Sequence, residues 1–342
     1  MASPNTYTSI SPRTIGRAVA RLLKNAKAEM LIEDYGQIDP QGENKTLTRI
    51  YRRYLPFPVA IAPVAEGVTP TGDVIQYQDV SVTLSQYAGV CKFTDIVQDT
   101  HEDPILNGVI IPNQKDQIAE TLETIRYNTL RAGTQVTYAP ANVATSRATV
   151  NGTLGRGDLQ KIVRHLKRNR ARMVSKILRA SARIATDPVL PAFAGLMHTD
   201  LESDLRKVPG FVDVAHYSDS DGSMRCEQGK VESIRFRTSD LFKPFLASGT
   251  SSTTWLSNGS AVTVAAAADV YPILIIGQDA YSIVPLSGTN AVTMYVENPR
   301  AQIGDEIAQN GFASWKTLQA TVITTQSWMH RYEVACTANP AN

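Results

Sequence analysis

Hydrophobic and polar positions follow two different rhythms along the chain, which predict helices in some stretches and strands in others. Residues 12–35 place apolar side chains on one stripe at helical spacing, between a capping Ser11 and a terminating Gly36. Five basic residues precede the first acid of this stretch, Glu29. The pattern predicts a basic amphipathic helix, which the turn-rich sequence DPQGENK joins to the rest of the chain.

After this hinge the rhythm changes to a period of two residues. Thr46 to Tyr54 are rich in β-forming residues, and Val80, Val82 and Leu84 alternate with polar neighbours, so two strands are predicted. Their connection contains four prolines and is far longer than an ordinary hairpin loop. A two-stranded ribbon buries little of its own surface. We therefore expect another surface to cover it, and a neighbouring subunit is the natural candidate.

Further helices and strands are predicted in the rest of the chain. One helix starts near Asp103 and Pro104 and ends at Gly133, and a second covers residues 158–185 with Asp158 as its cap. Beyond Pro191 the pattern is mixed α and β. Short strands are predicted at residues 232–237, 273–276, 293–296, 317–324 and 331–335.

Composition narrows the class of protein. A chain of 342 residues that is 43% hydrophobic and 19% charged can bury a sizeable core, in two or more compact parts. A net charge of +2 argues against a surface built entirely for nucleic acid. The three cysteines form no CxxC pair, so neither a disulfide framework nor a zinc site is indicated. The first residues lack a secretory signal and the longest apolar stretch, 270–276, is too short to cross a membrane, so we expect an intracellular protein.

Candidate catalytic and metal-binding motifs are few. One cluster gathers carboxylates and an imidazole, at Asp95, Asp99, His101, Glu102 and Asp103. It suits a hard metal ion, but the simpler interpretation is that Asp103 caps the next helix and the other carboxylates favour its positive end. The SDSDG sequence at 218–222 fails the spacing of a calcium loop, and nucleotide-binding loops fail as well. We expect no enzyme activity, no catalytic residue, no metal and no cofactor.

The strongest electrostatic feature is the segment 158–185. It contains nine Lys or Arg and a single acid, Asp158, and its apolar residues lie on the opposite stripe. Such a helix suits the phosphates of nucleic acid or an acidic neighbouring subunit. A solvated basic face is an equally simple interpretation.

Ten segments, in order along the chain, resemble the major capsid proteins of N4-like tailed phages. They are RRYLPFP (52–58), AEGVTPTG (65–72), LSQYAGV (84–90), TDIVQDTHEDPIL (94–106), ETIRYNTLRAGT (123–134), HTDLESDLRKVPGF (198–211), GKVESIRF (229–236), DVYPILIIGQDAY (269–281), SWKT (314–317) and WMHRYEVA (328–335). The Ser-, Thr- and Ala-rich segment 248–268 matches no motif of the family.

The resemblance implies an α+β, HK97-like capsid fold. Its parts would be an N-terminal arm (1–41), an extended β-hairpin loop (42–95), a peripheral domain with a long spine helix (96–156 and 281–342) and an axial domain (157–280).

The resemblance also implies a structural protein that self-assembles, through hexamers and pentamers, into the icosahedral head shell around the double-stranded DNA of a tailed bacteriophage. Scaffold, portal and decoration proteins would be further partners, and packaged DNA would be contacted non-specifically, with no membrane involved. The protein would be located in the virion capsid after assembly in the host bacterial cytoplasm. A nanocompartment (encapsulin-like) shell protein and a nucleic-acid-binding protein acting through its basic helices are the alternatives.

Two groups of charged residues are candidate contact sites. On the ribbon, Arg49, Arg52, Arg53 and Glu66 would contact neighbouring subunits, unless they are simply solvated. Candidates for facing DNA are Arg13, Arg17, Arg21 and Lys24 of the arm, and Lys167, Arg168, Arg170 and Arg172 of the basic helix.

Overall fold

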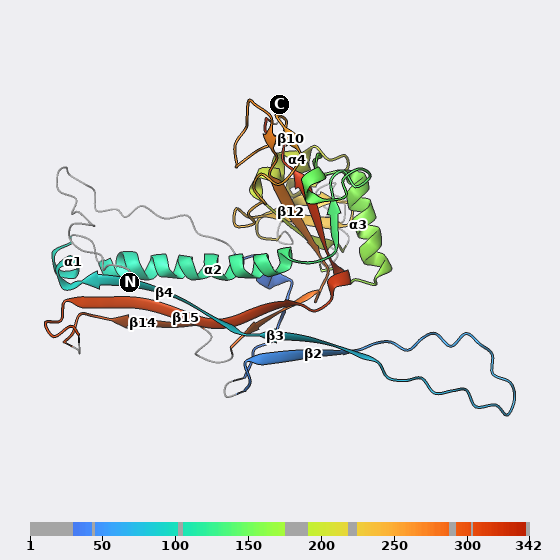
Figure 1. Ribbon diagram of the computed structural model, residues 1–342, viewed down its shortest axis with the longest axis horizontal. Coiled ribbons are helices and arrows are strands. Elements are labelled where there is room, and N and C mark those ends of the chain that lie inside the picture. Colours follow the sequence, from blue (N-terminus) through green and yellow to red (C-terminus); the bar gives the residue numbers. More distant parts are fainter. Residues whose placement is uncertain are drawn as a thin grey trace, which may run out of the picture.

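A computed structural model describes residues 30–42, 45–101, 105–174, 191–217, 224–286, 292–301 and 304–339. Figure 1 shows three parts: an elongated domain built along helix α2, a rounded domain at one end of it, and a thin β-ribbon that projects away from the elongated domain. The arm helix predicted at residues 12–35 lies almost entirely outside the described residues, and so do residues 218–222.

The elongated domain is organised around one long strand, β15 (Asn310–Ile323). On one side β15 pairs with β4 (Ser85–Thr94), and on the other with β14 (Val292–Glu297) and then β13 (Tyr281–Pro285), all antiparallel. A short strand, β1 (Gln37–Ile38), adds to β13 in parallel. Burial alternates along much of β15, as expected for a sheet with one face against a helix.

That helix is α2 (Ile111–Arg131), whose 21 residues span about 30 Å beside β15. Its end confirms the stop predicted at Gly133. Its start lies later than predicted, because α1 (Asp95–Thr100) and a π-helical segment, η2 (Ile105–Ile110), come first. Asp103 itself is outside the described residues.

The rounded domain contains a seven-stranded sheet. Its order is β5 (Val136–Tyr138), β16 (Met329–Ala335), β12 (Val270–Ile276), β6 (Phe193–Met197), β9 (Ile234–Thr238), β8 (Glu227–Val231) and β7 (Val212–Asp213). Every residue of the four strands from β16 to β9 is buried. Smaller elements are η1 (Ile32–Asp34), η3 (Arg147–Thr149), η4 (Thr199–Leu201), α4 (Glu202–Arg206), η5 (Val214–His216), β10 (Ser251–Ser252), β11 (Ala266–Ala267) and η6 (Gln326–Trp328). The predicted strands are therefore confirmed, with shifted ends.

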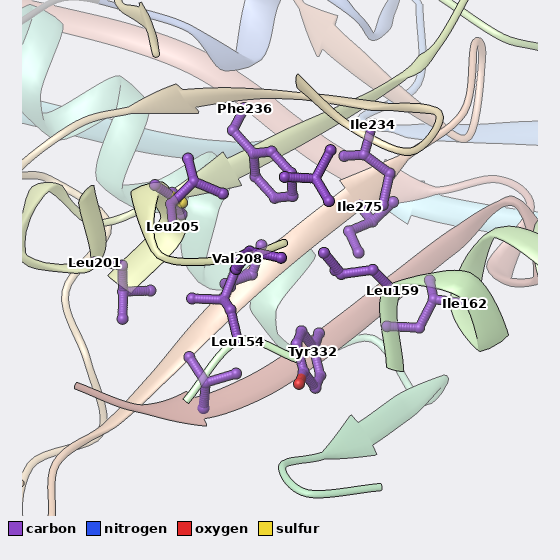
Figure 2. Packing of buried hydrophobic residues seen from close by; sticks show 14 of the residues in the cluster. Leu154, Leu159, Ile162, Leu201, Leu205, Val208, Ile234, Phe236, Ile275 and Tyr332 are labelled. Atoms are coloured by element: carbon purple, nitrogen blue, oxygen red, sulfur yellow. The ribbon is translucent and has the colours of Figure 1, made fainter. Parts of the chain in front are cut away.

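Helix α3 (Arg156–Arg168) covers the sheet of the rounded domain with its apolar stripe. Figure 2 shows Leu159 and Ile162 of α3 among the buried side chains of the sheet, with Ile275 of β12 and Tyr332 of β16 nearby. The same core includes Leu201 and Leu205 around α4.

Two details of the helix predicted at 158–185 are wrong. The helix ends at Arg168, since Asn169 turns and Arg170 takes a positive φ of 55° that a helix does not allow; residues 175–185 are outside the described residues. Asp158 is not the cap, because Gly155 occupies that position. The Asp158 carboxylate instead accepts hydrogen bonds from the Ala141 N–H and the Tyr332 hydroxyl, both at 3.0 Å.

The C-terminal strands are divided between the two domains. β15 belongs to the elongated sheet, whereas β16 pairs over seven residues with β12 and in parallel with β5 in the rounded domain. Local sequence pattern cannot distinguish these destinations, because the two strands differ in partners that lie far away in the sequence. The four predicted domain ranges remain a prediction.

The chain enters this framework through residues 31–38, of which Leu31, Ile32 and Tyr35 are buried. Leu31 and Ile32 are fully buried, and their backbone N–H groups donate to the Glu123 carboxylate of α2 at 2.9 and 3.0 Å. The Tyr281 hydroxyl of β13 donates to the Ile32 carbonyl. Helix α2 and the elongated sheet are thus tied together just before the chain passes into the ribbon.

A pair of histidines joins α3 to the sheet. His165 of α3 and His330 of β16 pack with their ring centroids 5.4 Å apart, and His330 Nε2 lies 2.7 Å from Thr137 Oγ1 of β5. Burial, with smaller contributions from the neighbouring His165 and Arg331, lowers the pKa of His330 to about 4. The folded protein therefore holds His330 neutral at neutral pH.

Acidification will destabilise the subunit through His330. Because the folded pKa lies below the ordinary value, the unfolded chain binds more protons between pH 6.5 and 4, so stability is full above pH 6.5 and falls towards pH 4. The loss at pH 4.5 should be roughly 2 kcal/mol. Urea unfolding of the unassembled subunit at pH 7 and pH 4.5 should show a smaller difference for His330→Gln than for the wild type. Equal pH dependence in both proteins would contradict this assignment.

Candidate subunit-contact surface

The ribbon consists of β2 (Thr48–Tyr54), β3 (Tyr77–Thr83) and the connecting loop 55–76. The strands pair antiparallel in continuous register, from Thr48 opposite Thr83 to Tyr54 opposite Tyr77. Every residue from 52 to 79 is exposed. The far half of the ribbon therefore receives no cover from the rest of the subunit, as the sequence predicted for two strands alone.

The loop exposes large apolar side chains. Val59, Ile61 and Val74 are 80% exposed or more, which is unusual for aliphatic residues in a folded subunit. The other large apolar residues exposed on the ribbon or next to it are Leu47, Ile50, Tyr54, Leu55, Phe57, Val64, Val68, Ile75 and Tyr77. An apolar surface of this extent marks a site of protein contact or of aggregation. The loop carries two acids, Glu66 and Asp73, and no basic residue.

The ribbon continues directly from the elongated sheet. β3 and β4 are separated only by Leu84, which is buried with Val284 of β13 and Ala320 of β15. Val82 and Tyr51 pack against the same small cluster. The pairing of β4 with β15 therefore sets the direction in which the ribbon leaves the subunit (Figure 1).

Side-chain hydrogen bonds fix the root of the ribbon to the elongated domain. The Arg53 guanidinium donates from Nη2 to the Thr324 carbonyl and the Thr325 hydroxyl, both at 2.6 Å. Tyr51 OH and Ser282 Oγ of β13 lie 2.8 Å apart. These bonds hold the base of the ribbon against the elongated domain, and the rest of the ribbon projects away from it. We call the two Arg53 hydrogen bonds the latch.

The four charged ribbon residues predicted as subunit contacts have different surroundings. Arg49 donates to the Pro40 carbonyl at 3.1 Å, and Arg53 forms the latch just described. Arg52 forms a bidentate pair with Asp79 across the ribbon, at 2.8 Å for both bonds, and lies over the Tyr77 ring. The hydrogen bonds from Arg52 lower the pKa of the Asp79 carboxyl. Glu66 makes no hydrogen bond or ion pair to any residue that the structure describes. Their contacts with other subunits remain a prediction.

The exposed apolar residues of the ribbon were not among the predicted contacts, which were all charged residues. The signal was present in the run VAIA, residues 59–62, which lies between Pro58 and Pro63 and has no polar alternation. Such a run in a long loop is hard to bury locally, because Pro56, Pro58 and Pro63 cannot donate to a sheet.

The outer face of α3 is basic. Arg164, Lys167 and Arg168 are exposed, and so are Arg170 and Arg172 just beyond the helix. The nearby acid Glu232 is already engaged by Arg156 at 2.6 Å, with the hydrogen bond holding the pKa of Glu232 below its ordinary value. The four cations predicted to face DNA in this stretch, Lys167, Arg168, Arg170 and Arg172, are therefore all exposed. Arg13, Arg17, Arg21 and Lys24 lie outside the described residues.

The described part of the chain contains no group of three or more His, Cys, Asp or Glu side chains placed to hold a metal ion. Of the candidate cluster, Glu102 and Asp103 are outside the described residues, and Asp95 begins α1. His198 caps η4 by accepting the Asp200 N–H at 3.1 Å. Among the helices described here, none is both long and apolar enough to cross a membrane.

No protein-family model and no curated protein sequence matches the chain. Solved structures do match over almost its whole length. The capsid of Ralstonia phage GP4 has a TM-score of 0.63 at 11% identity, covering 99% of this chain and 100% of that one. The capsid of cyanophage Pam1 has a TM-score of 0.60 at 9% identity, covering 96% and 100%. The capsid of cyanophage P-SCSP1u has a TM-score of 0.56 at 11% identity, covering 95% and 94%.

These likenesses show that the chain has the HK97-like α+β fold of tailed-phage capsid proteins. The expectation for the fold is therefore confirmed. The narrower resemblance to the N4-like phages stays a prediction.

Removing the latch should free the ribbon without unfolding the subunit. In Arg53→Ala both hydrogen bonds to Thr324 and Thr325 are lost, so the distance between a spin label on the loop at residue 68 and one on the body at residue 279 should spread over a wider range. Arg52→Ala is the matched control, because its partner Asp79 lies within the ribbon itself. A distance distribution that is unchanged in Arg53→Ala would show that other contacts hold the ribbon.

Proposed function

We propose that this protein is the major capsid protein of a tailed bacteriophage, with a structural role and no catalytic one. The observation that carries the proposal is the exposed apolar ribbon on an HK97-like fold. Its side chains leave water only if another molecule covers them, and a second copy of the same chain is the partner that is always available at equal concentration. Many such contacts, repeated by symmetry, close a shell.

In this proposal each part of the chain has a separate task. Residues 1–41 act as the arm and 42–95 as the extended loop. Residues 96–156 and 281–342 act as the peripheral domain around α2, with β16 reaching into the rounded domain, and residues 157–280 act as the axial domain. Subunits gather into hexamers and pentamers of an icosahedral shell in the virion. Assembly takes place in the bacterial cytoplasm, with scaffold, portal and decoration proteins as further partners.

The proposal includes non-specific contact with packaged double-stranded DNA. Four exposed cations support it: Lys167, Arg168, Arg170 and Arg172. Positive side chains bind the phosphates of DNA and release counterions, and this attraction does not depend on the base sequence. The arm residues Arg13, Arg17, Arg21 and Lys24 are proposed for the same task on their sequence alone.

A nanocompartment shell is the nearest alternative, because it uses the same fold to enclose enzymes. Two observations distinguish these functions. The gene of a phage capsid protein should lie beside portal and terminase genes, and its purified particles should contain DNA. The gene of a nanocompartment protein should lie beside a cargo gene, and its particles should contain the cargo protein. A nucleic-acid-binding monomer would instead bind DNA tightly without forming particles.

The loop is expected to be required for assembly and dispensable for folding. Replacement of residues 56–75 by a short Gly-Ser turn removes the exposed apolar side chains from Phe57 to Ile75 and no buried one. Electron microscopy should show closed shells or capsomers for the wild type and only folded monomers for the variant. Asp73→Asn is the control, which keeps the apolar surface and Glu66 and should still assemble. A monodisperse wild-type monomer would overturn the proposed function.

The α3 cations are expected to contribute to DNA binding through charge. Lys167→Glu with Arg168→Glu should weaken binding of duplex DNA and reduce the slope of log affinity against log salt by about 2, since each lost phosphate contact removes about one counterion. Lys207→Glu with Lys243→Glu makes the same change of charge elsewhere on the rounded domain and should leave the slope nearly unchanged. Equal slopes for both variants would remove α3 from the proposed DNA surface.

A further inference from the structure

An open hollow of about 730 Å³ lies between α3 and the turn that joins β8 to β9. Three of the residues that line it are cations, Arg164, Lys167 and Arg168, and one is an acid, Glu232. The hollow therefore has a positive lining with a single carboxylate in it.

The polar groups of the hollow are held in place by the core beneath them. Four polar side chains recur along α3 at intervals of three or four residues: Arg156, Gln160, Arg164 and Lys167. This spacing places them on one side of the helix. The apolar core fixes that side against the turn, because Val163, which also lines the hollow, lies in the same buried cluster as Val231 and Ile234.

The Glu232 carboxylate occupies the place that a bound anion would take. Its Oε1 accepts a hydrogen bond from Arg156 Nε at 2.6 Å and another from Gln160 Nε2 at 2.9 Å. These bonds, together with the charges of Arg156 and Lys167, hold the pKa of Glu232 below its ordinary value, so the group is ionised at neutral pH. Guanidinium and amide N–H groups of this kind also bind the phosphate oxygens of DNA.

The turn presents this carboxylate where the backbone favours a glycine. Val231 pairs with Ile234, so Glu232 and Ser233 are the two central residues of a tight hairpin turn. Glu232 has a φ of 53°, in the left-handed region, and glycine is the residue preferred at the first position of such a turn. The ion pair with Arg156 adds little stability in return, because it lies at the surface, with the Arg156 side chain 49% exposed. The fold therefore does not depend on the Glu232 side chain.

We infer that the hollow between α3 and the β8–β9 turn binds a phosphate of the DNA backbone, and that Glu232 is an internal competitor which the phosphate must displace. The inference rests on the proposed contact between α3 and DNA, and adds to it a binding site and a residue that limits its strength. An entering phosphate takes over the hydrogen bonds of Arg156 and Gln160, and the Glu232 side chain swings into solvent. Because the same competition recurs in every subunit, each phosphate contact stays weak and DNA is not held fast against the protein.

Removal of the competitor should strengthen DNA binding. Glu232→Gln keeps the size of the side chain and removes its charge, so the unassembled subunit should bind a short DNA duplex about two- to fivefold more tightly, the range expected for one exposed ion pair. The slope of log affinity against log salt should steepen by up to about 1, since Arg156 then neutralises a phosphate in every complex. Fluorescence anisotropy of a labelled duplex over a salt series measures both quantities.

Two further variants test whether the gain comes from this site. Asp240→Asn removes the same charge from an exposed residue at the opposite end of β9, and should change affinity and slope little. Arg156→Gln removes the proposed phosphate donor, so adding Glu232→Gln to it should give no gain. An equal gain from Glu232→Gln in the presence and absence of Arg156 would overturn the inference, because it would reflect overall charge and not the hollow.

The outcomes also separate this inference from the proposed function. If the wild type binds duplex DNA and Glu232→Gln binds it no more tightly, the competitor is overturned, and the contact between α3 and DNA stands or falls by Lys167→Glu with Arg168→Glu. If neither protein binds DNA at low salt, both the contact and this inference are overturned. Shell assembly is decided independently, by electron microscopy of the particles.

Discussion

A ribbon of two strands has no interior, so its apolar side chains can leave water only against another surface. In this protein the surface is missing from the subunit: residues 52–79 are all exposed, although many of them are aliphatic or aromatic. Burying these apolar side chains would release free energy, and only association with another molecule can bury them. Most other features of the elongated domain can be understood as means of presenting this ribbon in one direction.

The direction is set by β15. Its 14 residues pair with β4 on one side and with β13 and β14 on the other, which gives a thin sheet stiffness along its length. Because β3 passes into β4 with only the buried Leu84 between them, the ribbon inherits the orientation of that sheet. Arg53 and Tyr51 then hold its root, and Arg52 and Asp79 pair across it. The projecting part is stiffened by the subunit without being covered by it.

The rounded domain uses a different physical solution. Its central strands are buried on both faces, and the charges they carry are paired internally: Glu227 with Arg235 by two bonds of 2.6 Å, and Glu333 with Arg147 by two of 2.8 Å. A buried ion pair adds little net stability, because the cost of removing both charges from water offsets their attraction. The apolar core of the rounded domain continues into the elongated domain, because Phe242 and Leu274 share one buried cluster with Tyr127 of α2 and Tyr281 of β13. In the proposed function, association belongs to the ribbon, and electrostatic attraction belongs to the cations on and just after α3.

The sequence by itself determined the features that depend on near neighbours in the chain. The period-two pattern of Thr46 to Leu84, the stop at Gly133 and the apolar stripe of α3 predicted the ribbon, the long helix and the basic amphipathic helix. It also determined that the ribbon needs cover, because that follows from two strands and a long proline-rich connection. Its resemblance to a known family supplied the fold, which residue patterns alone left open.

The tertiary structure decided what depends on partners distant in sequence. It placed β16 in the rounded domain and β15 in the elongated one, and it turned Asp158 from a helix cap into a buried acceptor for Tyr332 of β16. It gave Arg52 and Arg53 partners within the subunit and left Val59 and Ile61 without cover. The physical reason is the same each time. Whether a side chain is buried or hydrogen-bonded depends on which strand or helix lies beside it. Local periodicity does not predict which strands pair when some two hundred residues separate them.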